Sequence, residues 1–182
     1  RMRIAQVSPL WESVPPKLYG GTERVVSFIT EELVRLGHDV TLFASGDSMS
    51  AARLEAICPQ ALRLLTGNLN REAPMTLLLE RAFSTSDEFD LIHSHLDFLG
   101  FPLVRRSRAA ALTTLHGRLD LPELEPVYRE FSEVPLVSIS DAQRRPLPWA
   151  NWQATVHHGL PRDLYDFHPR QGRYLAFLGR IA

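Results

Sequence analysis

Ile4-Ala5-Gln6-Val7-Ser8 is an apolar run of strand length, and Val25-Val26-Ser27-Phe28-Ile29 belongs to a helix-period segment. Between them stands Gly20-Gly21-Thr22-Glu23, where the strand passes into the helix. Two glycines at this point leave backbone amides bare at the positive end of the helix dipole, which favours phosphate or another oxygen-rich ligand. The alternative is a tight turn that needs glycine only for a positive φ. The segment predicts a strand–turn–helix unit with a ligand site at the turn.

Apolar runs of strand length alternate with helix-period segments along the chain. This alternation predicts an α/β fold, a Rossmann-like parallel sheet with helices on both faces. The predicted strands are residues 4–8, 40–44, 54–57, 91–94, 112–115, 136–139 and 154–157. The predicted helices are residues 22–36, 73–84, 99–106, 122–131 and 141–145, while residues 59–72 show no clear period.

The C-terminal part of the chain predicts a change of domain. Residues 1–159 are expected to form the Rossmann-like domain, and residues 160–173 contain Pro161, Pro169 and Gly172, a composition typical of an interdomain linker. Residues 174–181 have the pattern of a further buried strand. We therefore expect residues 174–182 to begin a second, truncated domain.

The charge and cysteine content exclude several classes of protein. The 182 residues include 20 basic and 21 acidic side chains, so the chain lacks the basic surplus of a sequence-independent nucleic-acid binder. Cys58 is the single cysteine, which excludes an internal disulfide and a cysteine-rich zinc site. No apolar run reaches the roughly 18 residues of a membrane span, and a cytoplasmic location is expected. The short clusters Arg105-Arg106 and Arg144-Arg145 fit solvated helix ends, with anionic membrane lipid or an acceptor phosphate as the alternative.

The loop before the glycine pair carries side chains suited to sugar hydroxyls. Residues 9–19 form a long connection that contains Trp11, Glu12, Lys17 and Tyr19. A structureless loop of this length in a compact domain is usually functional or disordered. The chain lacks both the G-x-G-x-x-G spacing of a dinucleotide fold and the phosphate loop of ATP-binding proteins. The sequence therefore does not indicate an NAD-binding or ATP-binding site of the usual kind.

His93-Ser94-His95-Leu96-Asp97 allows two interpretations. The segment resembles the first part of the H-x-H-x-D-H motif of metallo-hydrolases, although Phe98 replaces the final histidine. Residues two apart on a strand face the same side, so the two imidazoles could share a metal ion, but zinc needs three or four suitable ligands. In the other interpretation, His93 is hydrogen-bonded within the sheet and His95 lies at its rim.

His116-Gly117 follows a predicted buried strand and is expected at the edge of the sheet where ligands bind. A neutral imidazole there can donate or accept hydrogen bonds with hydroxyl groups, and glycine permits close approach of the backbone. A single histidine at a strand end is also compatible with a purely structural role.

Taken together, seven segments resemble the N-terminal domain of retaining family-four glycosyltransferases with the GT-B fold. In chain order they are Ile4–Leu10, Gly20-Gly21-Thr22-Glu23-Arg24, Asp39-Val40-Thr41-Leu42-Phe43-Ala44, Asp90-Leu91-Ile92-His93-Ser94-His95, Thr114-Leu115-His116-Gly117, Val137-Ser138-Ile139-Ser140 and His157-His158-Gly159-Leu160. Phe177-Leu178-Gly179-Arg180-Ile181 looks like the first strand of that family's C-terminal domain. The chain departs from the family at His158-Gly159-Leu160, where relatives usually carry Asn-Gly-Ile.

The resemblance implies two Rossmann-like domains that face each other across a cleft, with the acceptor mostly on this half and the nucleotide-sugar mostly on the other. It implies that Gly20 and Gly21 approach the donor diphosphate and that His116 lies beside the transferred sugar. The further expected cleft residues are Glu12, Lys17, Tyr19, Thr22, Arg24, His95, Asp97 and Gly117. No metal or cofactor is expected besides the nucleotide-sugar substrate, and the chain alone should transfer nothing.

Two other functions remain as alternatives. One is a metal-dependent hydrolase that uses His93, His95 and Asp97. The other is a non-catalytic module that binds carbohydrate or nucleotide.

Overall fold

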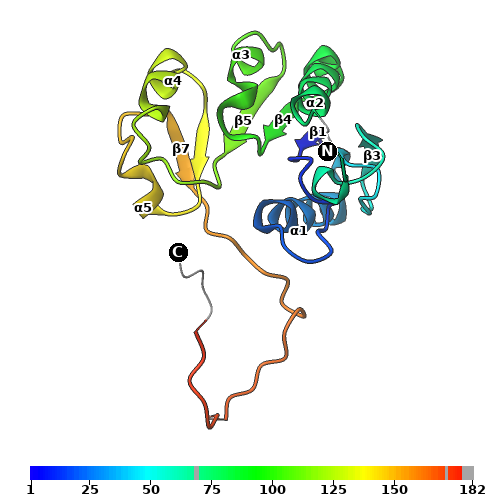
Figure 1. Cartoon of the computed structure of the whole chain (residues 1–182), viewed down its shortest axis with the longest axis vertical. Helices are drawn as coiled ribbons and strands as arrows, with labels where there is room; N and C mark the ends of the chain where they lie inside the picture. The colour runs from blue at the N-terminus through cyan, green and yellow to red at the C-terminus, as the bar shows by residue number, and fades with distance from the viewer. Residues whose placement is uncertain (68–69, 171, 178–182) are drawn as a thin grey trace.

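The computed structural model describes residues 1–67, 70–170 and 172–177, which contain a seven-stranded parallel sheet (Figure 1). The strand order is β3-β2-β1-β4-β5-β6-β7. The strands are β1 (Arg3–Val7), β2 (Asp39–Ala44), β3 (Arg53–Ala56), β4 (Leu91–Ser94), β5 (Ala110–Thr114), β6 (Leu136–Ser138) and β7 (Trp152–Thr155). All seven predicted strands are confirmed, with boundaries that move by two residues or fewer.

Helices cover both faces of this sheet, as the alternating sequence pattern predicts. The α-helices are α1 (Gly21–Arg35), α2 (Glu72–Ser84), α3 (Phe101–Val104), α4 (Leu124–Glu130) and α5 (Asp141–Arg144), and the 3-10 turns are η1 (Leu62–Leu64), η2 (Ser86–Glu88) and η3 (Asp97–Gly100). Figure 1 shows α1 on one side of the sheet and α2, α3 and α4 on the other. The Rossmann-like α/β fold class is therefore confirmed.

Alternation along the strands separates two apolar layers from each other. On the side of α2, Leu78 of that helix packs in one cluster with Val7 and Ile92. On the opposite face, Val26 of α1 packs with Leu42 of β2. Successive residues of a strand point to opposite faces, so β1 gives Ala5 and Val7 to the α2 side and leaves Gln6 for the α1 side.

One predicted helix is divided in the structure. The pattern predicts a helix over residues 99–106, but the chain forms η3 followed by the short α3. Pro102 stands in the first turn of α3 and has no backbone N–H. A continuous α-helix through this position would lose the bond from residue 102 to residue 98, which explains the break.

The C-terminal segment differs from its prediction where it is described. Residues 174–177 are irregular, and Tyr174, Leu175 and Phe177 are exposed, so these residues form no part of a buried strand. A strand requires hydrogen bonds to a neighbouring strand, and β7 ends at Thr155, well before this segment. The remainder of the predicted strand, residues 178–181, lies outside the described residues. Figure 1 shows the segment after β7 running away from the sheet, and the predicted linker over residues 160–173 stays a prediction.

Within the described residues, every helix is too short or too polar to cross a membrane.

The turn after β2 gives a stability prediction. A Cβ atom at Gly46 would lie 2.9 Å from the carbonyl oxygen of Pro59 and 3.0 Å from that of Cys58. The amide of Gly46 also donates to the carbonyl of Cys58 at 2.8 Å, so the two segments cannot separate without losing that bond. Gly46→Ala is expected to lower the free energy of unfolding by about 1–3 kcal/mol, measured by urea denaturation.

Gly159→Ala is the matched control for this substitution. No atom lies within 4 Å of the Cβ position at Gly159, so the change should stay within about 0.5 kcal/mol of the parent chain. Equal stability of the two variants would contradict the close approach at Gly46.

Candidate functional site

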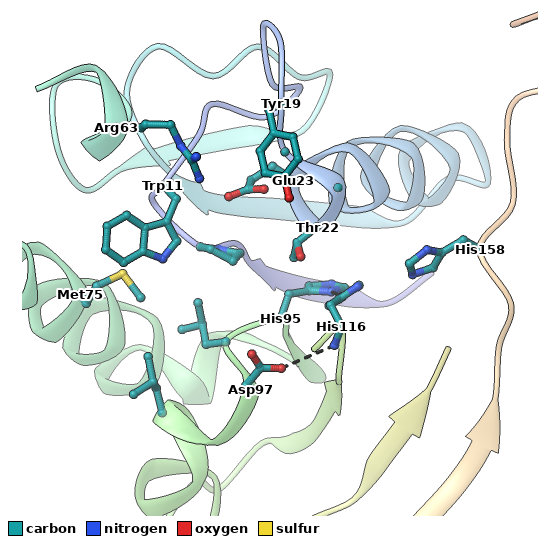
Figure 2. Close-up of a pocket in the computed structure, with 15 residues that line it drawn as sticks. Trp11, Tyr19, Thr22, Glu23, Arg63, Met75, His95, Asp97, His116 and His158 are labelled. Atoms are coloured by element: carbon teal, nitrogen blue, oxygen red, sulfur yellow. Dashed lines mark hydrogen bonds between the residues drawn. The ribbon is translucent and has the colours of Figure 1, made fainter. Parts of the chain in front are cut away.

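A cavity of about 410 Å³ opens at the carboxyl ends of β1, β4 and β5 (Figure 2). The chain leaves β1 toward β2 on one side and later returns to β4 on the other, so strand order switches between these neighbours. Ligands of open parallel sheets bind at such a switch point. Seven of the predicted site residues line the cavity: Tyr19, Gly20, Gly21, Thr22, His95, Asp97 and His116.

The glycine pair forms the start of α1 at the cavity wall. Gly20 is the residue before the helix, has φ 152°, and supplies no side-chain cap to the first turn. A Cβ atom at this position would lie 2.7 Å from the Cβ of Pro16 and 3.1 Å from the Cγ of Glu12, so glycine is required here. No atom lies within 4 Å of the Cβ position at Gly21, which is open to the cavity. The positive end of α1 therefore faces the cavity.

Two carboxylates and one guanidinium lie beside this helix start. Nε of Arg63 lies 2.5 Å from Oε1 of the buried Glu12, so these two charges offset each other. The same guanidinium lies over the ring of Tyr19 at 5.4 Å, which orders the tyrosine at the cavity rim. Burial raises the pKa of the Glu23 carboxyl, partly offset by the backbone amides of Glu23 and Glu12. Negative charge at the helix start is therefore reduced.

A line of hydrogen-bonded side chains crosses β1, β4 and β5 on the α1 side of the sheet. The amide of Gln6 contacts His93 through Nε2 at 3.2 Å and His95 through Oε1 at 2.9 Å. Nδ1 of His95 then lies 2.9 Å from Nε2 of His116, which reaches the cavity. At the other end, Nε2 of His93 lies 2.8 Å from the hydroxyl oxygen of Thr114. The predicted bonding of His93 within the sheet is present.

His95 differs from the position predicted for it. It follows β4 directly, as expected of a residue at the strand end, but it is only 2% exposed and does not form an open rim. Its backbone amide donates to the carbonyl of Val7 at 3.0 Å, which draws it in between β1 and β5. The histidine is therefore part of the cavity floor.

The three histidines of this line are uncharged at neutral pH. Burial lowers the pKa of His93 to about 4 and that of His116 to about 4. Burial also holds the pKa of His95 well below its usual value, with smaller effects from the neighbouring imidazoles. Each ring then carries one N–H donor and one lone pair, so the cavity floor is polar without positive charge.

Asp97 stands in an unusual backbone conformation at the same edge. Its φ is 49°, the one positive value recorded for a residue other than glycine in the described part of the chain. Such a conformation is disfavoured for most side chains and is frequent at functional sites. The backbone amide of His116 approaches Oδ1 at 3.5 Å, and burial raises the pKa of the carboxyl. Asp97 thus places a largely desolvated carboxyl group next to His116.

The other predicted site residues do not line the cavity. Arg24 donates to the carbonyl oxygens of Pro16 and Leu18 and so holds the loop before α1. Lys17 points toward Asp47, with 3.8 Å between Nζ and Oδ2. Glu12 lies behind the wall, paired with Arg63, and Gly117 accepts a bond at its carbonyl from the amide of Gln143.

Several residues in or behind the cavity have little or no signal in the sequence. Arg63 lies in η1, inside the stretch for which no periodicity predicted an element. Gln6 is one polar residue inside an apolar strand, and that break in the pattern was the available signal. His158 follows β7, and its ring centroid lies 5.4 Å from that of His116. Its position depends on the path of the chain after the sheet.

The metal-hydrolase alternative lacks a ligand set in the described residues, since no three His, Cys, Asp or Glu side chains there are grouped to hold a metal ion. Figure 2 and the hydrogen bonds show why: His95 is directed toward His116, and the Gln6 amide contacts both His93 and His95. The two histidines therefore contact an amide group instead of converging on a common point.

A second cavity of about 750 Å³ lies between α1 and the same face of the sheet. Its lining is mainly apolar and includes Phe28, Ile29, Leu112 and Val137. It contains none of the residues predicted for the glycosyltransferase cleft, and of the metal alternative only His93 lines it, so the candidate site is the smaller, more polar cavity.

The lowered histidine pKa values predict a loss of stability in acid. Below the unfolded pKa of about 6.5, these histidines bind protons in the unfolded chain but stay unprotonated in the folded chain. Stability therefore falls as the pH drops from 6.5 toward 4. Each such histidine contributes up to about 1.4 kcal/mol per pH unit within this window. The raised pKa values of Asp97 and Glu23 act in the opposite direction.

A variant isolates the histidine contribution from that of the carboxyl groups. His93→Gln retains hydrogen-bonding capacity but cannot titrate. The slope of unfolding free energy against pH should therefore decrease by the amount that corresponds to about one bound proton. The exposed His168→Gln is the control and should leave the slope unchanged. Urea denaturation between pH 7.5 and 4.5 measures both, and identical slopes for the two variants would refute the assignment.

Comparisons with known proteins agree with the fold of this domain. A crystal structure of AviGT4, a glycosyltransferase involved in avilamycin A biosynthesis, is similar, with 22% identity and a TM-score of 0.54 over 86% of this chain and 41% of that one. Sucrose-phosphate synthase from Thermosynechococcus elongatus is similar with 16% identity and a TM-score of 0.57, over 86% of this chain and 47% of that one. MurG from Acinetobacter baumannii is similar with 12% identity and a TM-score of 0.53, over 89% of this chain and 47% of that one. At these identities the likeness shows the fold alone.

This chain spans less than half the length of each of those three structures. No curated protein matches it significantly. The sequence profile of Glycosyltransferase Family 4, in contrast, matches residues 19–181, which is most of the chain and includes the start of α1, His93, His95, His116 and Asp97. The chain therefore belongs to Glycosyltransferase Family 4.

Proposed function

We propose that this chain is the acceptor-side half of a retaining glycosyltransferase, which moves a sugar from a nucleotide-sugar to a hydroxyl group of an acceptor. One observation carries the proposal: the start of α1 and the imidazole of His116 line the same cavity at the switch point of the sheet. An anion-binding backbone and a hydrogen-bonding ring are the two groups that a sugar diphosphate needs on this side. Family membership and the fold of the neighbours support glycosyl transfer.

The helix start is the proposed contact for the donor diphosphate. The side chain of Gly21 is absent and Gly20 provides no cap, so backbone amides of the first turn remain for oxygen atoms of the ligand. The charge of Glu12 is offset by Arg63, and burial raises the pKa of the Glu23 carboxyl. Both effects reduce repulsion of an incoming phosphate.

His116 is the proposed contact for the transferred sugar. Glycosyl transfer develops positive charge on the sugar ring as the bond to phosphate breaks. The lowered pKa keeps the His116 ring neutral, so it adds no repulsion to that charge. The carboxyl of Asp97 lies next to the backbone of His116, and in its ionised form it would stabilise that charge.

The remaining parts of the reaction are assigned to a second domain that closes the cleft. That domain would grip the nucleotide and the diphosphate, and the cleft would place the acceptor hydroxyl against the sugar. The proposal contains no metal and no cofactor, because the nucleotide-sugar is a substrate. A cytoplasmic location is also proposed, supported by the single cysteine, Cys58, which is unpaired and buried.

Substitution of His116 tests the proposed contact to the sugar. His116→Ala in the full-length enzyme, assayed against a panel of nucleotide-sugars, is expected to lower kcat/KM about 100-fold, the scale for loss of one preorganised polar contact. The exposed His168→Ala is the control and should retain activity. The chain of residues 1–182 alone should give no turnover, and full activity of His116→Ala would refute the assigned role.

Pyrophosphate tests the proposed anion site on the chain itself. Titration followed by ¹H–¹⁵N NMR is expected to shift the backbone amides of Gly21 and Thr22 before others. Gly20→Ala should abolish these shifts, because its Cβ atom would displace the loop at Pro16. Gly159→Ala, which meets no atom within 4 Å, should preserve them. Shifts spread over surface arginines in place of these amides would contradict the site.

A further inference from the structure

The three uncharged histidines, two of which line the cavity, are linked through hydrogen bonds that have a direction. A neutral imidazole has one nitrogen that donates and one that accepts. When one nitrogen of a ring is fixed as a donor, the other must be an acceptor. The polarity of each bond in the line from Gln6 to His95 and His116 is therefore determined by its neighbour.

Gln6 is the residue that sets this direction, because the two ends of its amide differ. Its oxygen, Oε1, can only accept, so Nε2 of His95 must carry the proton in their 2.9 Å bond. Nδ1 of His95 is then a lone pair, and Nε2 of His116 must donate to it across 2.9 Å. It follows that Nδ1 of His116 carries no proton.

The opposite end of the line is consistent with the same direction. Nε2 of Gln6 can only donate, so Nδ1 of His93 accepts at 3.2 Å and Nε2 of His93 is the N–H. That group donates to the hydroxyl oxygen of Thr114 at 2.8 Å. A hydroxyl can either donate or accept, so Thr114 adapts to the line and does not set its direction.

In this arrangement Nδ1 of His116 is an acceptor without a donor. It is buried and has no hydrogen-bond partner among the described residues. An unpaired buried acceptor is unfavourable, and a lone pair can be satisfied only by an O–H or N–H group. Ionised phosphate and carboxylate oxygens cannot supply that proton. His116 lines the cavity, so a ligand hydroxyl that displaces the groups now covering Nδ1 can provide the donor.

We propose that Gln6 and His95 are positioning residues that hold His116 in its Nε2–H tautomer, so that Nδ1 accepts a hydrogen bond from a hydroxyl group of the bound ligand. That this hydroxyl belongs to the transferred sugar rests on the proposed function. The tautomer itself does not, because it follows from the contacts of this chain alone.

Two-bond ¹H–¹⁵N NMR of the chain labelled at histidine nitrogen tests the tautomer directly. At pH 7.5 the three rings are neutral, and protonated and unprotonated ring nitrogens give well-separated signals. The expected result is N–H at Nε2 for both His95 and His116. If the Gln6 amide were reversed, both rings would instead carry N–H at Nδ1, and that result would overturn the proposal.

Two variants separate control of the tautomer from general disturbance of the line. Gln6→Met keeps the side-chain length but removes both polar atoms, so His116 is expected to show a mixture of tautomers. Thr114→Val removes the partner at the far end and should leave His116 as Nε2–H. An unchanged His116 signal in Gln6→Met would overturn the role of Gln6, and the wild-type spectrum decides the tautomer even if this variant fails to fold.

Activity of the full-length enzyme links the tautomer to sugar transfer. Gln6→Met should lower kcat/KM at least about tenfold, as loss of groups that orient a ligand-contacting histidine does elsewhere, while Thr114→Val should stay within about twofold. A mixed tautomer with unchanged kcat/KM would overturn the contact to the sugar. Absence of transfer from every nucleotide-sugar would refute the proposed function and leave the NMR result standing.

Discussion

The switch in strand order between β1 and β4 is the constraint on which the site depends. The chain continues from β1 to β2 on one side and reaches β4 on the other, so the segments that follow β1 and β4 diverge and leave a crevice. The glycine turn follows β1, His95 and Asp97 follow β4, and His116 follows β5. Gly20 and His116 therefore line one cavity although they are far apart in sequence, because the segments that carry them leave the same edge of the sheet.

Desolvation gives this crevice its electrostatic character. Burial removes the charge of the histidines and raises the pKa values of Asp97 and Glu23, while Arg63 is matched by Glu12. The positive potential on this wall comes mainly from the dipole of α1, which is weak compared with a full charge. Such a wall can orient a diphosphate but cannot neutralise it, which agrees with the proposal that a second domain supplies further cationic groups.

Strand alternation joins the site to the core of the domain. Ala5 and Val7 pack on the α2 side of β1, and the intervening Gln6 begins the line of hydrogen bonds on the α1 side. The position of Gln6 is thus fixed by apolar contacts on both sides of it in sequence. A shift of β1 by one residue would bury its apolar side chains on the wrong face and also remove the amide from the histidines.

Local sequence patterns are enough to predict the α/β class, all seven strands and the position of the glycine turn, because periodicity and glycine act locally along the chain. The sequence also identified His116, His95 and Asp97 as candidates, since polar residues at the ends of apolar runs stand out. It also proposed Glu12, Lys17, Arg24 and Gly117, which do not line the cavity, and it contained no signal for Arg63. The folded domain alone shows which of these side chains share a cavity and how Gln6 links the histidines. Those contacts join residues far apart in sequence, and their geometry is set by sheet register and packing, which no local pattern encodes.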